Sequence, residues 1–577
     1  MKKKLLPALI VTGLIILVVI IMGITALINK YTPTKKTEDL KEYFNISSDD
    51  EAALIVDNEL SDYKAKIIDK KIYVDYKFVH DSLNSRFYWD ANENVLLYTT
   101  ASDIISAAAD SNSYSVTKQT NDFGYPIVKA TSDSALIALD YVKQYSNITF
   151  KSYDDPARIV ITSKWDEIDS ATVSKSTQVR VKGGIKSPIL KEVKKDDKIT
   201  ILDSGDKWDK IATEDGVIGY IKGKALSESK KTKLTNPDYE EETFTHIKKD
   251  KDICLAWNQV TSQSANSKVP QVISSTKGIN VMSPTWFYLN DNNGNLADIA
   301  SKDYVSYCHS QGIEVWGLFS NFENTDVDAA YVLTHTSTRT TLINQIMSAA
   351  FNYELDGVNI DFENITEAAY GDSYIEFIRE LSIKCHNNGI SLSVDVTVPA
   401  SFNKFFNRSD MAKFADYIVI MGYDEHYKGS DAGSVSSIPW VTEGVESTLK
   451  EVPADQIILG MPFYTRIWEL TPKEDDDAVI DTEDQSKYTV ASQVYSMDAA
   501  AAQLATNNAT AALDEESGQN YAEWSASNKL YKVWLEDSTS LEKRLKLVDD
   551  NKLAGAAFWK LGFENSSVWD TVIKYLN

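Results

Sequence analysis

Cysteine and histidine are scarce in this chain of 577 residues, which contains three cysteines and six histidines. Cys254, Cys308 and Cys385 are odd in number and lie in apolar stretches, which predicts buried thiols rather than a disulfide framework. The histidines lack the short spacing of a zinc site, and no Cys-x-x-Cys motif accompanies them. We therefore predict that the protein uses neither a metal nor a cofactor.

Basic residues are the minority among the charged ones. The chain has 59 Lys and Arg against 84 Asp and Glu, which gives a net charge of −25 and a pI near 4.8. This balance disfavours non-specific binding to nucleic acid, whose backbone is also negative. It fits the soluble part of an exported protein.

Only one long uncharged run is present, "LLPALIVTGLIILVVIIMGITALIN" from Leu5 to Asn29, and Lys2, Lys3 and Lys4 precede it. About 20 apolar residues suffice to cross a bilayer. A secretory signal has a shorter apolar core of roughly 7 to 15 residues and a small-residue cleavage site, which the sequence does not show. We predict an uncleaved anchor in residues 1–30, with the lysines in the cytoplasm and the rest outside the cell. A cleaved long signal is the alternative, and either reading exports the protein.

The length predicts several domains. Residues 42–165 contain alternating stretches such as "KIYVDYKFV" and "VLLYTT", which indicate strands around short helices, an α+β domain. The stretch "IYVDYKFVHDSLNSRFYWDANENVLLYT" resembles the small domain named for the N-terminal region of copper amine oxidases. The resemblance implies a fold and no copper, and a role as spacer or wall contact.

Residues 170–227 alternate in short stretches between Gly-Gly, Asp-Asp, Ser-Gly and Asp-Gly turns, which predicts a small all-β barrel. The order "VRV…G…K…W…I…DG…GYI" resembles a bacterial SH3-type domain. Between Val173 and Leu226, 12 basic residues against 8 acidic ones give +4. A wall peptide or anionic wall polymer is thus a candidate ligand, and a plain spacer is the alternative. Residues 228–250 are charged, contain Asn-Pro and indicate a linker.

Residues 251–577 alternate short apolar strands with longer helical stretches. Eight such strands predict a (β/α)₈ TIM barrel, an α/β fold in which catalytic residues sit at the C-terminal ends of strands. An insertion at about 466–537, before the eighth strand, contains the acidic run "KEDDDAVIDTED" and an alanine-rich helix. We expect the insertion to wall one side of the cleft, and the acidic run to be a solvated loop rather than a calcium site.

The stretch "LDGVNIDFENI", residues 355–365, places polar side chains in an apolar strand. Asn359, Asp361 and Glu363 are spaced by two and therefore point to one face, the barrel interior, with Glu363 at the mouth. Asp356 has the opposite parity and is expected to support the site by hydrogen bonding. Carboxylates so close together raise the pKa of at least one of them, and a protonated glutamic acid in a cleft is a general acid. A satisfied polar layer in the barrel core is the alternative.

The same stretch resembles the D-x-x-D-x-D-x-E signature of glycoside hydrolase family 18, with Asn359 in place of the second Asp. "MGYDEHY", "LGMPFYTRIW" and "GAAFWKLGFEN" resemble that family's segments in strands six, seven and eight. The resemblance implies a substrate-assisted, retaining mechanism. Glu363 would protonate the glycosidic oxygen, and Asp361 would orient the substrate's acetamide group, whose carbonyl attacks the anomeric carbon. Asn359 cannot ionise, but it can donate a hydrogen bond to Asp361, which predicts a changed pH profile.

The resemblance also implies roles around the reacting sugar. The expected residues are Tyr423, which would hydrogen-bond the acetamide oxygen; Asp424, a sugar contact; Trp559, which would stack under the sugar ring; Met421 of the strand-six segment; and Tyr464 and Arg466, cleft contacts of which the Arg would alternatively support a carboxylate.

The predicted function is a membrane-anchored extracellular glycoside hydrolase that cleaves β-1,4 bonds in an N-acetylglucosamine-containing polymer, with peptidoglycan favoured. Chitin is the alternative substrate. A catalytically silent glycan-binding barrel is a second alternative, for which Asn359 is the argument. The retained Glu363 favours an enzyme, because chitinase-like lectins of the family usually lack that glutamate.

Overall fold

The computed structural model describes residues 2–363, 365, 368–473 and 485–576. The chain forms two compact units. The first comprises Met1–Trp89, Ala107–Tyr114 and Asp122–Glu241, and the second Asp90–Ser106, Ser115–Asn121 and Glu242–Asn577.

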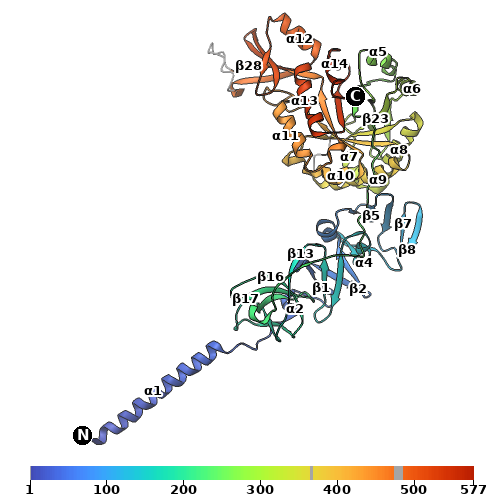
Figure 1. Ribbon diagram of the computed structural model, residues 1–577. Coiled ribbons are helices and arrows are strands. Elements are labelled where there is room, and N and C mark those ends of the chain that lie inside the picture. The colour runs from blue at the N-terminus through green and yellow to red at the C-terminus, as the bar shows by residue number, and fades with distance from the viewer. Residues whose placement is uncertain (1, 364, 366–367, 474–484, 577) are drawn as a thin grey trace. The chain divides into compact units, whose positions relative to one another are not determined.

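The N-terminal apolar run forms α1 (Lys2–Tyr31), one continuous helix in Figure 1. Its segment Pro7–Tyr31 has a mean hydropathy of 2.9, and its side chains are exposed. Among the described residues this is the one helix long and apolar enough to cross a membrane. Length and composition fit an anchor and a signal peptide alike.

The remainder of the first unit is built on two seven-stranded sheets. One has the order β11-β12-β1-β2-β3-β10-β9, and the other, wholly antiparallel, has the order β15-β14-β18-β17-β16-β13-β19. Phe44 and Ile55 from the first part share a core with Val179 and Ile211 from the second. The segments expected as two domains therefore pack as one body, and their resemblances to named domain families stay predictions.

The bounds of these elements are β1 (Glu51–Val56), β2 (Glu59–Ile68), β3 (Lys71–Asp75), β9 (Val128–Ala130), β10 (Ala135–Ala138), α4 (Leu139–Tyr145), β11 (Thr149–Tyr153), β12 (Arg158–Thr162), β13 (Glu167–Thr172), β14 (Thr177–Arg180), β15 (Ile189–Val193), β16 (Lys198–Asp203), β17 (Trp208–Thr213), β18 (Ile218–Lys222) and β19 (Lys230–Lys233).

The second unit contains the expected barrel of eight parallel strands. They are β20 (Ile253–Asn258), β21 (Val281–Leu289), β23 (Glu314–Ser320), β24 (Gly357–Asp361), β25 (Ser391–Thr397), β26 (Tyr417–Met421), β27 (Ile457–Pro462) and β33 (Gly555–Trp559). Each pairs with the next in parallel, and β33 closes the ring by pairing with both β27 and β20.

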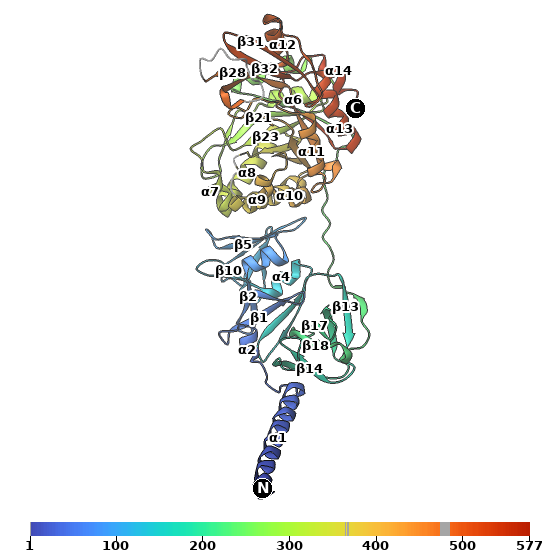
Figure 2. The same cartoon turned by 90° about the vertical axis from the view of Figure 1, so that its left-hand side faces the viewer.

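Helices surround these strands (Figures 1 and 2). The main ones are α6 (Lys302–Ser310), α7 (Ala329–Thr334), α8 (Thr336–Tyr353), α9 (Ala368–His386), α10 (Arg408–Phe414), α11 (Ile438–Thr448), α13 (Ser538–Asn551) and α14 (Val568–Val572). The strands read as near-continuous apolar runs because they are buried on both faces. Outward residues such as Val358 and Ile360 pack against the helices. Inward residues such as Trp257, Trp316 and Val419 fill the interior. Cys254, Cys308 and Cys385 are buried free thiols, as expected.

The insertion before the eighth strand forms an antiparallel sheet of order β29-β28-β32-β31-β30 with α12 (Met497–Thr506) beside it (Figures 1 and 2). Its strands are β28 (Tyr464–Pro472), β29 (Tyr488–Ser496), β30 (Ala512–Asp514), β31 (Gln519–Ala526) and β32 (Lys529–Leu535). The first part of the alanine-rich stretch is helical, as the sequence predicts, whereas its end from Ala512 lies in β30. The acidic run lies outside the described residues from position 474 onward.

Residues 90–106 and 115–121 belong to the same unit as the barrel, which the sequence pattern did not indicate. Within this unit, Thr99 of β5 (Val95–Thr99) donates to Glu376 of α9 at 2.9 Å. Asp90 accepts from the backbone N–H and the hydroxyl of Thr336, and so caps the N-terminus of α8. Residues distant in sequence thus form hydrogen bonds with two barrel helices, α8 and α9.

Candidate active site

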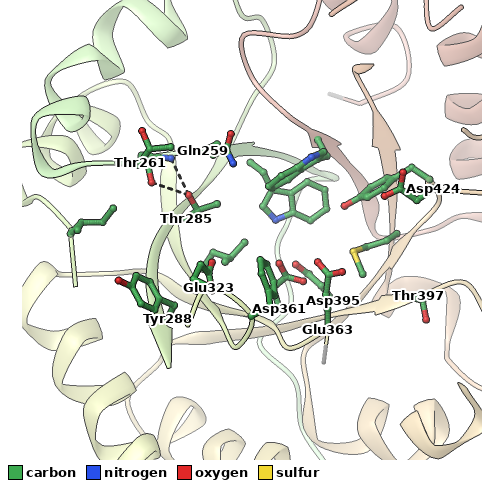
Figure 3. A pocket seen from close by; sticks show the side chains of 18 residues that line it. Gln259, Thr261, Thr285, Tyr288, Glu323, Asp361, Glu363, Asp395, Thr397 and Asp424 are labelled. Atoms are coloured by element: carbon green, nitrogen blue, oxygen red, sulfur yellow. Dashed lines mark hydrogen bonds between the residues drawn. The ribbon is translucent and has the colours of Figure 1, made fainter. Parts of the chain in front are cut away.

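A cavity of about 540 Å³ opens where the barrel strands end (Figure 3). Side chains from the ends of seven strands or from the loops after them line it: Trp257, Gln259, Val260, Thr261, Thr285, Tyr288, Ile299, Leu318, Phe322, Glu323, Asp361, Glu363, Asp395, Thr397, Met421, Tyr423, Asp424 and Trp559. Five are acidic and none is Lys or Arg. None comes from the described part of the insertion, so the expectation that the insertion walls this cleft is not met by those residues.

Asn359 lies below the cavity in the barrel interior and is fully buried. Its Oδ1 accepts from Trp257 Nε1 and Ser283 Oγ, both at 2.9 Å. Its Nδ2 donates to Asp395 Oδ1 at 2.7 Å and to Ser393 Oγ at 3.0 Å. The expected hydrogen bond from Asn359 to Asp361 is therefore wrong: the amide is turned to the neighbouring strand, because two donors occupy its oxygen.

Asp361 is the last residue of β24 and lines the cavity. Its Oδ1 is buried and has no hydrogen-bond partner among the described residues. Burial, followed by the negative charges of Asp395 and Glu363, raises the pKa of Asp361 well above the usual range for aspartic acid. Asp361 Oδ1 is therefore available to accept a hydrogen bond from a ligand bound in the cavity.

Glu363 follows the end of β24 by two residues and faces the open cavity. The walls of the cavity desolvate its carboxyl group, and this raises its pKa, with further contributions from the charges of Asp424 and Glu323. A glutamic acid that keeps its proton beside a cleft can donate it to a bound substrate.

Asp395 and Glu323 complete the acidic lining, and sequence reasoning missed both. Asp395 lies on β25 next to Asp361, and Glu323 follows β23 and accepts from Ser320 Oγ at 2.6 Å. The signal for Asp395 was its even spacing from Ser391 and Ser393 in "SLSVDVTV", which marks an inward polar face. For Glu323 the sequence offered only its position just after a strand.

Three predicted residues line the cavity beside the carboxylates: Met421, Tyr423 and Trp559. The Trp257 ring bridges the last two, with centroids 6.4 Å from Tyr423 and 6.0 Å from Trp559 in edge arrangements. Burial raises the pKa of Tyr423 well above the usual range for tyrosine, so its hydroxyl remains a donor.

Asp424 also lines the cavity, whereas Tyr464 and Arg466 do not. Tyr464 donates its hydroxyl to Asp424 Oδ1 at 2.6 Å, and Arg466 Nη2 donates to the same oxygen at 3.5 Å. Both lie on β28, at the start of the insertion sheet, and hold the carboxylate of Asp424. The assignment of Tyr464 as a cleft contact is thus corrected, and for Arg466 the alternative of supporting a carboxylate is confirmed.

Asp356 precedes β24, at the opposite end of the strand from the cavity. It accepts from the backbone N–H of Val315 at 2.8 Å, and His309 Nε2 lies 2.8 Å from the same carboxylate oxygen. These bonds join β24 to β23 and to α6, so Asp356 contacts structure rather than substrate.

The site geometry agrees with the family comparison, in which residues 319–564 match the model described as Glycosyl hydrolases family 18. This part of the barrel is similar to the glycosyl hydrolases of family 18. The matched range begins in β23, and the barrel strands β20 and β21 lie before it.

Two curated relatives and one solved structure are similar to this chain. "Uncharacterized glycosylase YvbX" of Bacillus subtilis (strain 168) is 24% identical over 299 residues, which are 49% of this chain and 81% of that protein. "Cortical fragment-lytic enzyme" of the same organism is 24% identical over 287 residues, 48% of this chain and 63% of the relative. A crystal structure of a C-terminal domain from Desulfitobacterium hafniense DCB-2 superposes with a TM-score of 0.50 at 18% identity, covering 56% of this chain and 98% of that domain. The last comparison supports the barrel fold.

Proposed function

We propose that the protein is a membrane-anchored glycosidase that cleaves β-1,4 bonds of an N-acetylglucosamine-containing polymer, peptidoglycan in the first place. The carrying observation is the pairing of Glu363, whose pKa is raised by burial at the cavity, with a buried Asp361 whose Oδ1 has no hydrogen-bond partner in the described part of the chain. An acid and a free acceptor side by side suit a substrate that offers a glycosidic oxygen to one and an amide N–H to the other.

In the proposed reaction Glu363 donates its proton to the glycosidic oxygen while the substrate's acetamide carbonyl oxygen bonds to the anomeric carbon. The bond to the leaving sugar breaks, and a cyclic oxazolinium forms. Asp361 accepts the acetamide N–H and offsets its growing positive charge. Water then attacks the anomeric carbon, Glu363 takes a proton from it, and the acetamide re-forms with retained configuration.

The other cavity residues bind and orient the sugar. The Tyr423 hydroxyl donates to the acetamide oxygen, which sharpens its aim at the anomeric carbon. Trp559 offers an aromatic face to the apolar face of the ring. Asp424, fixed by Tyr464, accepts from a sugar hydroxyl.

Peptidoglycan is favoured over chitin by the rest of the chain. α1 is long enough for an anchor, and a barrel tethered outside the cell would face the wall. One relative is, by its name, lytic for cortical fragments. The silent-barrel alternative is weakened because Glu363 is present and Asn359 is satisfied by four hydrogen bonds without touching the cavity.

The test is product analysis by mass spectrometry after the full chain in detergent is incubated with purified peptidoglycan and with chitin oligomers. Wild type should release fragments with new reducing-end N-acetylglucosamine from peptidoglycan, and Glu363→Gln should release none. Glu443→Gln, an exposed glutamate of α11, is the matched control and should match wild type. Release from chitin oligomers alone would move the substrate to chitin, and binding without release by wild type would overturn the enzyme reading.

A further inference from the structure

Asp395 lies on β25 at the position beside Asp361. The register pairs Asn359 with Ser393 and Ile360 with Val394, so the next residues along the two strands, Asp361 and Asp395, are neighbours on the interior face. Adjacent strands are about 4.8 Å apart, which brings their side chains together. Both are buried, with 6% and 3% of their surface exposed, and both line the cavity (Figure 3).

Asp395 is held in place by an uncharged donor. Asn359 Nδ2 donates to Asp395 Oδ1 at 2.7 Å, and the amide cannot flip because Trp257 and Ser283 both donate to its oxygen. The lining residues include no Lys or Arg. Two buried carboxyl groups without a cation cannot both be ionised at low free-energy cost.

We propose that Asp395 is a positioning residue for the reaction, acting through Asp361: the two carboxyl groups hold one proton between them, and Asp395 keeps that proton when the substrate's acetamide group binds Asp361. This inference rests on the proposed function.

The proton step balances within the pair. Before binding, the proton is shared between Asp361 and Asp395, and the pair carries a single negative charge. When the acetamide N–H donates to Asp361, the O–H bond on Asp361 breaks and one forms on Asp395. The negative charge is then fixed on Asp361, opposite the developing oxazolinium, and the total charge of the pair is unchanged.

Two glutamates and two tyrosines are the other titratable groups that interact with Asp361 and Asp395 in the described part of the chain. Glu363 follows the same strand as Asp361, and Glu323 faces Asp361 from the loop after β23. Tyr374 of α9 and Tyr423 after β26 both interact electrostatically with Asp361 and Asp395. Burial raises the pKa of both tyrosines well above the usual range for tyrosine, so they stay neutral where the carboxyl groups titrate.

The first test compares Asp395→Asn with the exchange variant Asn359→Asp/Asp395→Asn. Asp395→Asn should lower kcat by about 10²-fold, a proton-transfer magnitude, with KM changed far less. The acid limb of its kcat against pH profile should move to lower pH, because Asp361 loses the neighbouring charge that raises its pKa.

The exchange variant keeps one carboxyl and one amide at these two positions. A carboxylate at position 359 would retain the donors Trp257 and Ser283, and an amide at position 395 could donate to it. The exchange variant should regain most of the kcat that Asp395→Asn loses, and its acid limb should return toward the pH of wild type. Asp549→Asn, an exposed residue of α13, serves as the control. An unchanged kcat and profile in Asp395→Asn, or an exchange variant no more active than the single one, would overturn the proposal.

A second measurement needs no turnover. Infrared spectroscopy of the protonated carboxyl band is followed against pH in a Glu363→Gln background, with and without Asp395→Asn. The midpoint at which the last buried cavity carboxyl ionises should be lower with Asp395→Asn, and thermal unfolding establishes that both proteins are folded. Equal midpoints would refute the shared proton. Because this readout is independent of substrate, failure of the proposed glycan assignment remains separate from failure of this inference.

Discussion

Glu323 lines the same cavity as Glu363, and its negative charge is one of the causes that raise the pKa of Glu363. Glu323→Gln should retain the hydrogen bond with Ser320 but remove the charge. The pKa of Glu363 should then fall. Since Glu363 must be protonated to act, the alkaline limb of kcat/KM should move to lower pH, as steady-state kinetics from pH 4 to 9 would reveal. An alkaline limb that stays fixed or moves to higher pH would contradict the prediction that the charge of Glu323 raises the pKa of Glu363.

A substitution at Tyr464 tests whether β28 acts on the site indirectly, by holding the carboxylate of Asp424. Tyr464→Phe removes the donor that holds Asp424 Oδ1 while keeping the ring. One hydrogen bond to a carboxylate is lost, so KM should rise by about fivefold with kcat little changed. Kinetics on a soluble oligosaccharide would measure this split. A large fall in kcat at constant KM would instead place Tyr464 in the chemical step.

For single residues, the sequence predicted which side chains of one strand share a face, but it did not predict contacts between residues of different strands. Period two placed Asn359 and Asp361 on the inward face correctly. Asp395 was missed because its importance comes from the register between β24 and β25, which no single-strand pattern encodes. Tyr464 was misplaced as a cleft contact because the chain turns into the insertion sheet there, where its side chain reaches Asp424 from outside the cavity. Arg466 supports the same carboxylate, which was the alternative role predicted for it.

Among the elements, α13 is tied to the site loop by a buried ion pair. Arg544 Nη1 contacts Glu536 at 2.6 Å, Nη2 contacts the same carboxylate at 2.9 Å, and Arg544 also donates to the carbonyl of Ser436. The Ser436 hydroxyl in turn donates to the carbonyl of Gly422, the residue before Tyr423. One arginine thus connects the end of the insertion with the loop that carries Tyr423 into the cavity.

Arg544→Met should therefore lower the free energy of unfolding by about 3 to 5 kcal/mol, because Glu536 is left buried and unpaired. Urea unfolding followed by tryptophan fluorescence would measure the loss. The double variant Arg544→Met/Glu536→Leu removes both charges and should recover a substantial part of it. A single variant as stable as wild type would contradict the buried-pair reading, as would a double variant less stable than the single one.

The elements themselves were largely predictable where their period was clear. All eight barrel strands, α9 and α12 follow from apolar periodicity and turn residues. The five-stranded insertion sheet was not foreseen as a sheet, since its strands are exposed on one side and alternate weakly, as in the mixed burial of β29 and β31. Their pairing depends on partners distant in the chain.

For the whole molecule, the apolar helix α1 predicts that the protein partitions into the membrane fraction rather than the soluble fraction. The full chain should remain with the membrane pellet after alkaline carbonate washing and be released by detergent, whereas a chain starting at Tyr31 should be soluble, because removing about 20 apolar residues removes the energy of bilayer insertion. N-terminal sequencing of the full-length product provides the control. A soluble product with a new N-terminus near residue 30 would establish a cleaved signal instead.

The division of the chain into units was the least predictable property. Linker composition placed a boundary near residue 250, yet residues 90–106 group with the barrel. The contacts responsible, Thr99 with Glu376 and Asp90 with Thr336, join positions more than 240 residues apart. Polar residues on strand ends and helix termini look like ordinary surface until their partner is known.

Closure of the ring by β33 has a bearing on synthesis. Because β20 and β27 each need β33 as a neighbour, a chain that stops before Gly555 has two open strand edges and lacks Trp559. The ring therefore cannot close until the last strand has been made, and a truncated product would have neither a closed barrel nor a complete cavity lining. An incomplete chain would therefore be unable to cut the polymer that we propose as substrate, and activity would begin only after β33 has been synthesised and has paired with β20 and β27.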